Sequence, residues 1–93
     1  MKVKICGIPH KIVKVQEQLD VVTCFGMIDH KKAEIRINRD ITPDLQKETI
    51  CHEVLHGIFV HIGREDLSND EGFIQCLASA INQSFDVRLE DDE

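Results

Sequence analysis

Residues 52–56 of this 93-residue chain have the sequence His-Glu-x-x-His, a spacing that can hold a metal ion. In a helix, residues four apart lie one turn above each other on one face, so His52 and His56 can direct their imidazoles at the same ion. Glu53, about 100° round the helix from His52, is placed to contact the attacking water rather than the ion. The flanking residues are strongly apolar, and burying these groups without a metal would be costly. The motif therefore predicts a zinc site with Glu53 as catalytic base.

A catalytic zinc normally takes three protein ligands and leaves its fourth position open, so the motif needs one more ligand. The best candidate is Glu71, fifteen residues after His56, on the first turn of a helix expected to fold back against the first. The sequence Ser68-x-x-Glu71 also fits a capping box, in which the glutamate bonds back to the N-cap amide and needs no metal. Asp70 and His61 remain as alternative third ligands.

Length and composition limit the classes of protein that the chain can represent. Ninety-three residues allow one domain, which we place at residues 1–89, followed by an acidic solvated tail at 90–93. The net charge is −6 and the basic residues are dispersed, so we expect no nucleic-acid partner. No apolar run has the length of a membrane span or the form of a signal peptide. We expect a cytoplasmic protein without a membrane partner, as a monomer or a small homo-oligomer.

The four cysteines are far apart and form no Cys-x-x-Cys pair, which makes a separate structural zinc site improbable. Without a secretion signal they are expected to be reduced and mostly buried. Cys51 is next to His52, so we consider it a candidate thiol close to the metal.

The hydrophobic pattern predicts strands in the first part of the chain and helices in the second. Residues 2–5, 12–15, 21–28 and 33–38 have strand-like patterns, separated by turns at 7–10 and 29–32, which indicates two consecutive antiparallel hairpins. Gly26 inside the third strand indicates a bulge or a close approach of another element. The strand at 33–38 is expected to offer an edge to an extended substrate.

Helix signals begin at Thr42-Pro43-Asp44, with an N-cap, a proline at the first helical position and an acid near the positive end of the dipole. This first helix is predicted to run to about Ile62, stopped by Gly63, and to be buried on more than one side. A polar loop at 64–69 and a second helix at 69–84 should follow, with a short final strand at 84–89. The predicted fold class is α+β: about four strands in antiparallel hairpins packed on two helices, the first carrying the motif.

Together, the β-rich N-terminal part, the helix with the His52-Glu53-x-x-His56 motif and a following helix that opens with Asp70-Glu71 resemble the gluzincin branch of the zincin metallopeptidases. The sequence is most similar to the small ImmA/IrrE-like type common in phages and mobile elements. The resemblance implies that His52, His56 and Glu71 hold zinc and that Glu53 is the catalytic base.

The expected activity is metal-assisted hydrolysis of a peptide bond in an intracellular protein. Glu53 would accept a proton from the attacking water and deliver it to the leaving nitrogen. The chain contains no tyrosine, so stabilisation of the oxyanion falls to His61, Arg64 or His30, or to zinc alone. Two alternatives remain open: a zinc-binding but non-proteolytic interaction protein, and a metal-free α+β protein that binds a partner.

Overall fold

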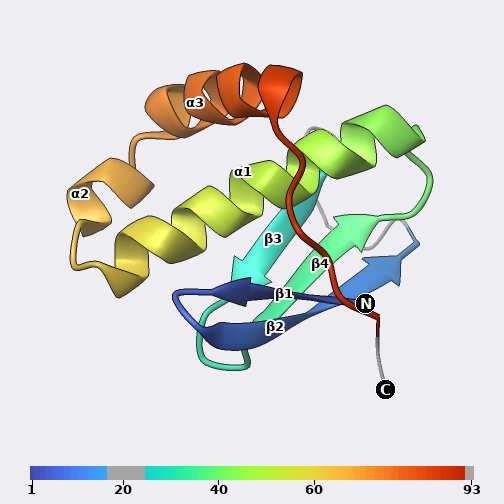
Figure 1. Cartoon of the computed structure of the whole chain (residues 1–93), viewed down its shortest axis with the longest axis horizontal. Helices are drawn as coiled ribbons and strands as arrows, with labels where there is room; N and C mark the ends of the chain where they lie inside the picture. The colour runs from blue at the N-terminus through green and yellow to red at the C-terminus, as the bar shows by residue number, and fades with distance from the viewer. Residues whose placement is uncertain (17–24, 92–93) are drawn as a thin grey trace.

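The protein is an α+β domain in which helices cover one face of a four-stranded sheet (Figure 1). A computed structural model describes residues 1–16 and 25–91. The elements in chain order are β1 (Lys2–Ile5), β2 (Ile8–Val15), β3 (Gly26–Asp29), β4 (Glu34–Asn38), α1 (Pro43–His61), α2 (Glu65–Ser68) and α3 (Glu71–Ser84). No helix of the described residues combines the length and the apolar character needed to cross a membrane. The predicted α+β class with four strands is confirmed, but the sheet is mixed rather than antiparallel and the described residues form three helices instead of two.

The sheet has the strand order β1-β2-β4-β3. Both predicted hairpins are present, because β1 pairs antiparallel with β2 and β3 pairs antiparallel with β4. The two hairpins are joined by a parallel pairing of β2 with β4, in which Ile12 lies opposite Ile35. The predicted third strand at 21–28 falls partly outside the described residues, and its described part begins at Gly26. The prediction that residues 33–38 form an edge is wrong, because β4 is paired on both sides and β3 is the outer strand.

The first hairpin turn is tighter than the sequence suggested. Cys6 and Gly7 make the turn with positive φ angles of 51° and 85°, and Ile8, Pro9 and His10 already belong to β2. In the second hairpin, the Asp29 carboxylate accepts hydrogen bonds from the backbone N–H groups of two turn residues, Lys31 and Lys32, at 3.0 and 3.1 Å. These local bonds fix the turn without help from the rest of the fold.

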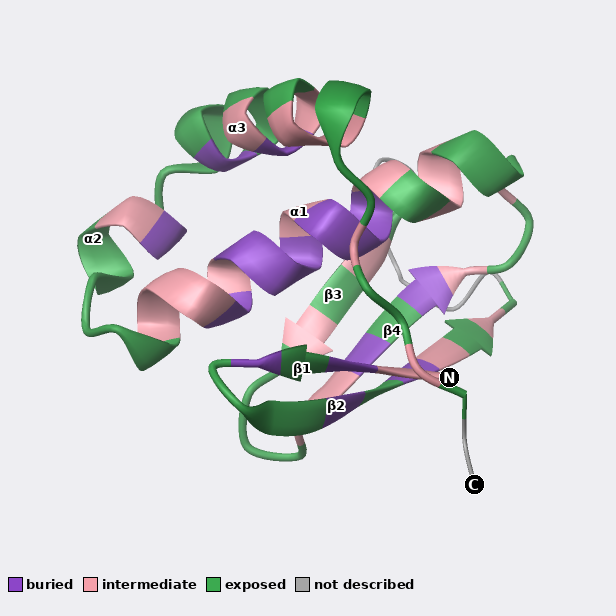
Figure 2. Ribbon diagram, viewed as in Figure 1, coloured by how far each residue is buried: buried purple, intermediate pink, exposed green. Residues whose placement is uncertain are grey.

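Helix α1 lies between the sheet and α3 and is buried on both sides (Figure 2). One core cluster joins the sheet to α1 and contains the buried residues Val3, Ile5, Ile12, Ile35, Ile37, Ile50 and Val54. The other joins α1 to α3 and contains Cys51, Leu55, Ile74 and Ala78. The predicted burial of the first helix on more than one side is confirmed.

The start and end signals of α1 are also confirmed. The Thr42 side chain caps the helix by accepting a hydrogen bond from the Leu45 N–H, and Pro43 is the first helical residue. The helix ends at His61, and Gly63 follows with φ of 80°. Ile62, the predicted last residue of the helix, is its C-cap and is 56% exposed.

Two expectations for the second half of the chain are wrong. The polar segment after α1 folds into the short helix α2 instead of a loop, so α3 begins only at Glu71. Residues 84–89 form no strand; the only pairing there is a bridge between Glu90 and Lys2, with two backbone hydrogen bonds of 2.8 and 2.9 Å. The acidic tail therefore begins with a residue that is tied to the edge of β1.

The free cysteines differ from the prediction in their burial. Cys51 is buried, but Cys6 and Cys76 are exposed, and Cys24 lies outside the described residues. Cys6 is exposed because it occupies the tight turn between β1 and β2.

Gly26 is a site of close approach between β3 and α1. A Cβ built on it would lie 2.6 Å from Thr49 Cγ2 and 3.0 Å from the backbone oxygen of Arg36. Neither neighbour yields easily, because one is backbone and Thr49 is itself bonded through Oγ1 to the Leu45 oxygen at 2.7 Å. This contact sets the distance between the outer strand and the helix that carries the motif.

We therefore expect Gly26→Ala to lower the free energy of unfolding by about 1–3 kcal/mol through overpacking, measured by urea denaturation. Gly72→Ala is the matched control, because a Cβ there would meet only an Asp70 oxygen at 3.7 Å. The control should be neutral or slightly stabilising, since alanine is the better helix former. Equal stability of Gly26→Ala and the native protein would contradict the close approach.

Candidate metal centre

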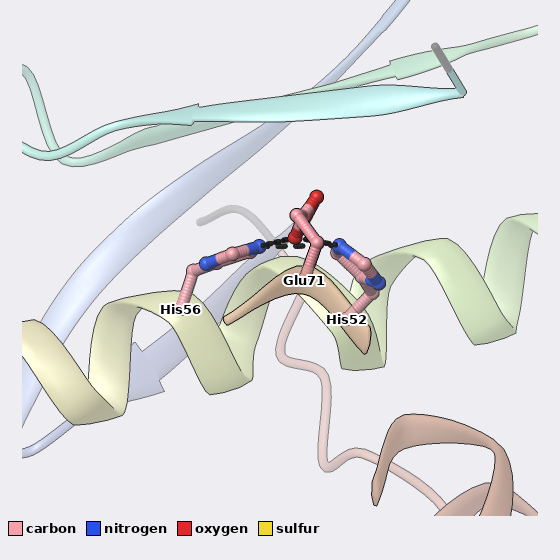
Figure 3. A group of neighbouring side chains, drawn as sticks. All are labelled: His52, His56 and Glu71. Carbon is pink, nitrogen blue, oxygen red and sulfur yellow. Dashed lines mark hydrogen bonds and ion pairs between the residues drawn. The ribbon is translucent and has the colours of Figure 1, made fainter. Parts of the chain in front are cut away.

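The side chains of His52, His56 and Glu71 converge on one point between α1 and the first turn of α3 (Figure 3). The Nε2 atoms of the two histidines lie 3.1 Å apart. Glu71 Oε1 lies 3.2 Å from Nε2 of His52 and 2.7 Å from Nε2 of His56. Among the described residues, this is the only group of three or more potential ligands whose donor atoms lie within 4.8 Å of one another. The structure thus brings together the three residues chosen from the sequence.

A chain of hydrogen bonds fixes which nitrogen of His52 carries a proton. Glu48 accepts from the Ser79 hydroxyl at 2.9 Å, and that hydroxyl accepts from the Gln75 amide nitrogen at 3.3 Å. The Gln75 oxygen then lies 2.9 Å from His52 Nδ1 and can only accept, so Nδ1 carries the hydrogen. The Nε2 atom of a neutral His52 consequently presents a lone pair to the centre.

Ser68 performs the same task for His56. Its hydroxyl donates to the backbone oxygen of His56 at 3.3 Å, and its oxygen lies 3.1 Å from His56 Nδ1. Since the hydroxyl hydrogen is already used, Nδ1 of His56 is the donor in the second contact. Ser68 is buried, so water does not compete for these bonds.

Three acceptor atoms therefore face one another: two imidazole lone pairs and a carboxylate oxygen. Such an arrangement is repulsive unless a cation or a proton lies between the atoms. Ligands at about 2.0–2.1 Å from a tetrahedral zinc ion lie about 3.3 Å apart. The His52–His56 and His52–Glu71 separations of 3.1 and 3.2 Å are close to this value, and the His56–Glu71 separation of 2.7 Å is shorter. Imidazoles that donate their second N–H to an oxygen are typical of metal ligands. The donor set fits a zinc ion.

Glu71 is free to face the histidines because another residue caps α3. The Asp70 side chain is the N-cap and accepts from the Phe73 N–H at 3.0 Å. The capping-box interpretation of Ser68 and Glu71 is therefore wrong, and Asp70, the alternative ligand, is engaged as the cap. His61 also lies outside the group, since its ring contacts His10 instead.

Glu53, the predicted catalytic base, is 6% exposed on α1. The pKa of its carboxyl group is raised to about 7, mainly because burial raises it; the charge of His52 lowers it and the charge of Glu71 raises it. No hydrogen bond to this carboxyl group comes from any described residue. Glu53 is thus a buried acid that interacts electrostatically with two of the candidate ligands and forms no hydrogen bond with another side chain of residues 1–16 and 25–91.

Cys51, considered as a thiol near the metal, points elsewhere. Its sulfur lies 3.9 Å from the backbone oxygen of Ala78, in the core between α1 and α3. Burial, followed by the negative charge of Glu48, raises the pKa of this thiol, which keeps it neutral. Cys51 acts as a core residue.

The three residues proposed to stabilise the oxyanion have different surroundings. Arg64 is exposed and forms two hydrogen bonds with the Asp66 carboxylate, at 3.1 and 3.0 Å. His61 lies beside His10. The pKa of His30 is lowered, first by burial and then by the charge of His56. His30 therefore interacts electrostatically with one of the candidate ligands.

Sequence analysis missed Gln75 and the role of Ser68 in orienting the ligands. A glutamine on a helix gives no signal by itself, but its position four residues after Glu71 places it on the same face of α3 as that ligand. That spacing is the signal that could have identified it.

Comparison with protein-family models, with curated proteins and with solved structures finds no match. The inference to function consequently depends on the chemistry of the side chains described above.

We expect Gln75→Ala to weaken zinc affinity by about 10–100-fold, the usual effect of removing a partner that orients a metal ligand. The loss follows because His52 would no longer be held in the tautomer and ring orientation that direct Nε2 to the centre. Competition with a chelating zinc indicator measures the affinity. Gln83→Ala, an exposed position on the same helix, is the control and should leave the affinity unchanged. An unaffected Gln75→Ala variant would remove Gln75 from the site.

The metal-free protein should lose stability as pH rises through the range in which Glu53 ionises. The pKa of this group is 4.5 in its ordinary state and about 7 in the fold, so between these values the folded protein binds more protons than the unfolded chain. The free energy of unfolding attributable to Glu53 therefore falls from about pH 4.5 to about pH 7 and stays low above it.

The substitution Glu53→Gln removes this pH dependence of the free energy of unfolding. In chelator, the variant should be more stable than the native protein at pH 8, by on the order of 3 kcal/mol, and the difference should vanish near pH 4.5. Urea denaturation of both proteins across this range measures it, and the comparison cancels the titration of the histidines. A difference that is independent of pH would contradict the burial of an ionisable Glu53.

Proposed function

We propose that the protein is a zinc-dependent metallopeptidase of the gluzincin type, with His52, His56 and Glu71 as zinc ligands and Glu53 as catalytic base. The observation that carries the proposal is the convergence of three acceptor atoms from α1 and α3 beside a buried acid that has no hydrogen-bond partner in the described part of the chain. A site with only a structural role would close its fourth position with another ligand, and the described residues supply three.

The chemistry that zinc supplies when bound is Lewis-acid activation of water and polarisation of the substrate carbonyl. Glu53 accepts the proton of the attacking water and delivers it to the leaving nitrogen. A carboxyl group with a pKa of about 7 suits both steps near neutral pH, because neither protonation state is strongly favoured. His52 and His56 are held in position by Gln75 and Ser68, so the ligand geometry is present before substrate arrives.

The substrate we propose is an extended peptide segment of an intracellular protein, lying along β3. This strand lies alongside the part of α1 that carries the motif. A Cβ at Gly26 would meet Thr49, and a Cβ at Gly57 would meet Ile28 at 3.1 Å. Within the described residues β3 pairs only with β4, so its other side faces the position that an added strand would take. As the edge for the substrate, β3 replaces the strand at residues 33–38 that the sequence suggested.

His30 is the best candidate for stabilising the oxyanion. It lies in the turn after β3, and its pKa responds to charge on His56. Because its pKa is lowered, His30 would act as a neutral N–H donor near pH 7.

The proposal predicts a separation between metal binding and activity. Glu53→Gln should retain one zinc ion and lose peptidase activity by about 10²–10⁴-fold, the usual contribution of a general base, whereas His56→Ala and Glu71→Ala should lose the zinc. Elemental analysis and cleavage of a fluorogenic peptide library, with casein as a protein substrate, measure the two properties. Glu65→Gln is the control, because Glu65 is an exposed glutamate outside the centre.

Peptidase activity that survives Glu53→Gln would overturn the assigned base. A zinc-loaded native protein with no activity on any peptide would favour a non-proteolytic interaction protein, which the absence of tyrosine in the chain also favours. A native protein without zinc, purified without chelator, would exclude both.

A further inference from the structure

A second set of histidines, His10, His30 and His61, lies outside the candidate metal centre. His10 is in β2, His30 is in the turn between β3 and β4, and His61 is the last residue of α1. The five histidines of the chain thus divide between the centre and this set.

His10 has an unusual environment for a polar side chain. It is 1% exposed, and its Nδ1 lies 2.8 Å from the backbone oxygen of Ile8. A carbonyl oxygen can only accept, so Nδ1 carries a hydrogen. The other nitrogen, Nε2, is buried and has no hydrogen-bond partner in the part of the chain that the structure describes.

An unpartnered buried imidazole nitrogen costs free energy, and a charged imidazole in the same place would cost more. His10 is therefore best accommodated as the neutral tautomer with a lone pair on Nε2. A histidine whose Nδ1–H is bound to a backbone carbonyl and whose Nε2 has a free lone pair is in the state that metal binding requires. His52 and His56 in the first centre are prepared in the same way.

His61 is a second donor whose ring lies beside that of His10. Its ring centroid lies 6.0 Å from that of His10 and the ring planes are inclined by 81°. In the first centre the corresponding centroids lie 4.8 Å apart. His61 is exposed at a helix end, so a change of rotamer can close the remaining distance.

His30, in the turn after β3, interacts electrostatically with both of these histidines. Its pKa is lowered by burial, then by charge on His56, His61 and His10, while Asp29 acts in the opposite direction.

We propose that His10 and His61 bind a second divalent cation of the class that prefers imidazole, such as Zn²⁺, with water completing the coordination. Imidazole ligands suit zinc, copper and nickel better than magnesium or calcium. Two protein ligands give weaker binding than three, so this second site fills after the first.

The test is a Zn²⁺ titration of the metal-free full-length protein by isothermal calorimetry, with elemental analysis after dialysis. The native protein should bind two ions in two phases. His56→Ala should abolish the tight phase and keep the weak one, and His61→Ala should weaken the weak phase by at least about tenfold and keep the tight one. Lys47→Ala, an exposed position toward the other end of α1, should keep both.

His61 is chosen rather than His10 because its exposed ring can be removed without opening the core. A single ion per chain at saturating Zn²⁺, or a weak phase that persists in His61→Ala, would overturn the proposal. The His56→Ala variant isolates the second site, so this result is independent of whether the first centre hydrolyses peptides.

Discussion

The whole arrangement depends on the burial of α1 between two layers. The sheet packs on one side of the helix through Ile50 and Val54, and α3 packs on another through Cys51 and Leu55. Residues 52 and 56 point to the remaining sector, where the start of α3 faces them. Because apolar contacts fix α1 on two sides, the orientation of its third side is also fixed. The two imidazoles are thus oriented by packing of their neighbours before any ligand is considered.

The groups of the candidate centre lower the stability of the metal-free fold. Two imidazole lone pairs face the Glu71 carboxylate oxygen, because Nδ1 of His52 donates to Gln75 and Nδ1 of His56 donates to Ser68, which fixes both tautomers. Glu53 adds a buried acid whose pKa is raised to about 7. In a domain of this size, whose stability is a small difference between large terms, such groups are retained when they serve a function. A bound cation offsets the repulsion among them.

The sequence identified the residues that follow from helix periodicity. His52, Glu53 and His56 are fixed by the spacing within one helix, and Glu71 follows from the expectation that the next helix packs back on it. The hairpins were visible from alternation, whereas the parallel pairing of β2 with β4 was not, because pairing between separate hairpins leaves no local pattern. The role of Gln75 required knowledge of how α3 sits on α1. The sequence fits an N-cap at Asp70 and a capping box starting at Ser68 equally well. The capping box is excluded because Ser68 belongs to the short helix α2, which the sequence did not predict.

The position of Glu71 links metal binding to folding. The other two ligands belong to α1, whereas Glu71 is the first residue of α3, reached through α2, and its side chain is 68% exposed. Apolar packing of Ile74 and Ala78 holds α3 on α1, whereas the Glu71 carboxylate contacts only the two imidazoles among the described residues. A cation bound by all three residues would cross-link the two helices at the start of α3, adding its binding free energy to the stability of a domain with two small cores. The metal would thus stabilise the same packing of α3 on α1 that completes its own ligand set.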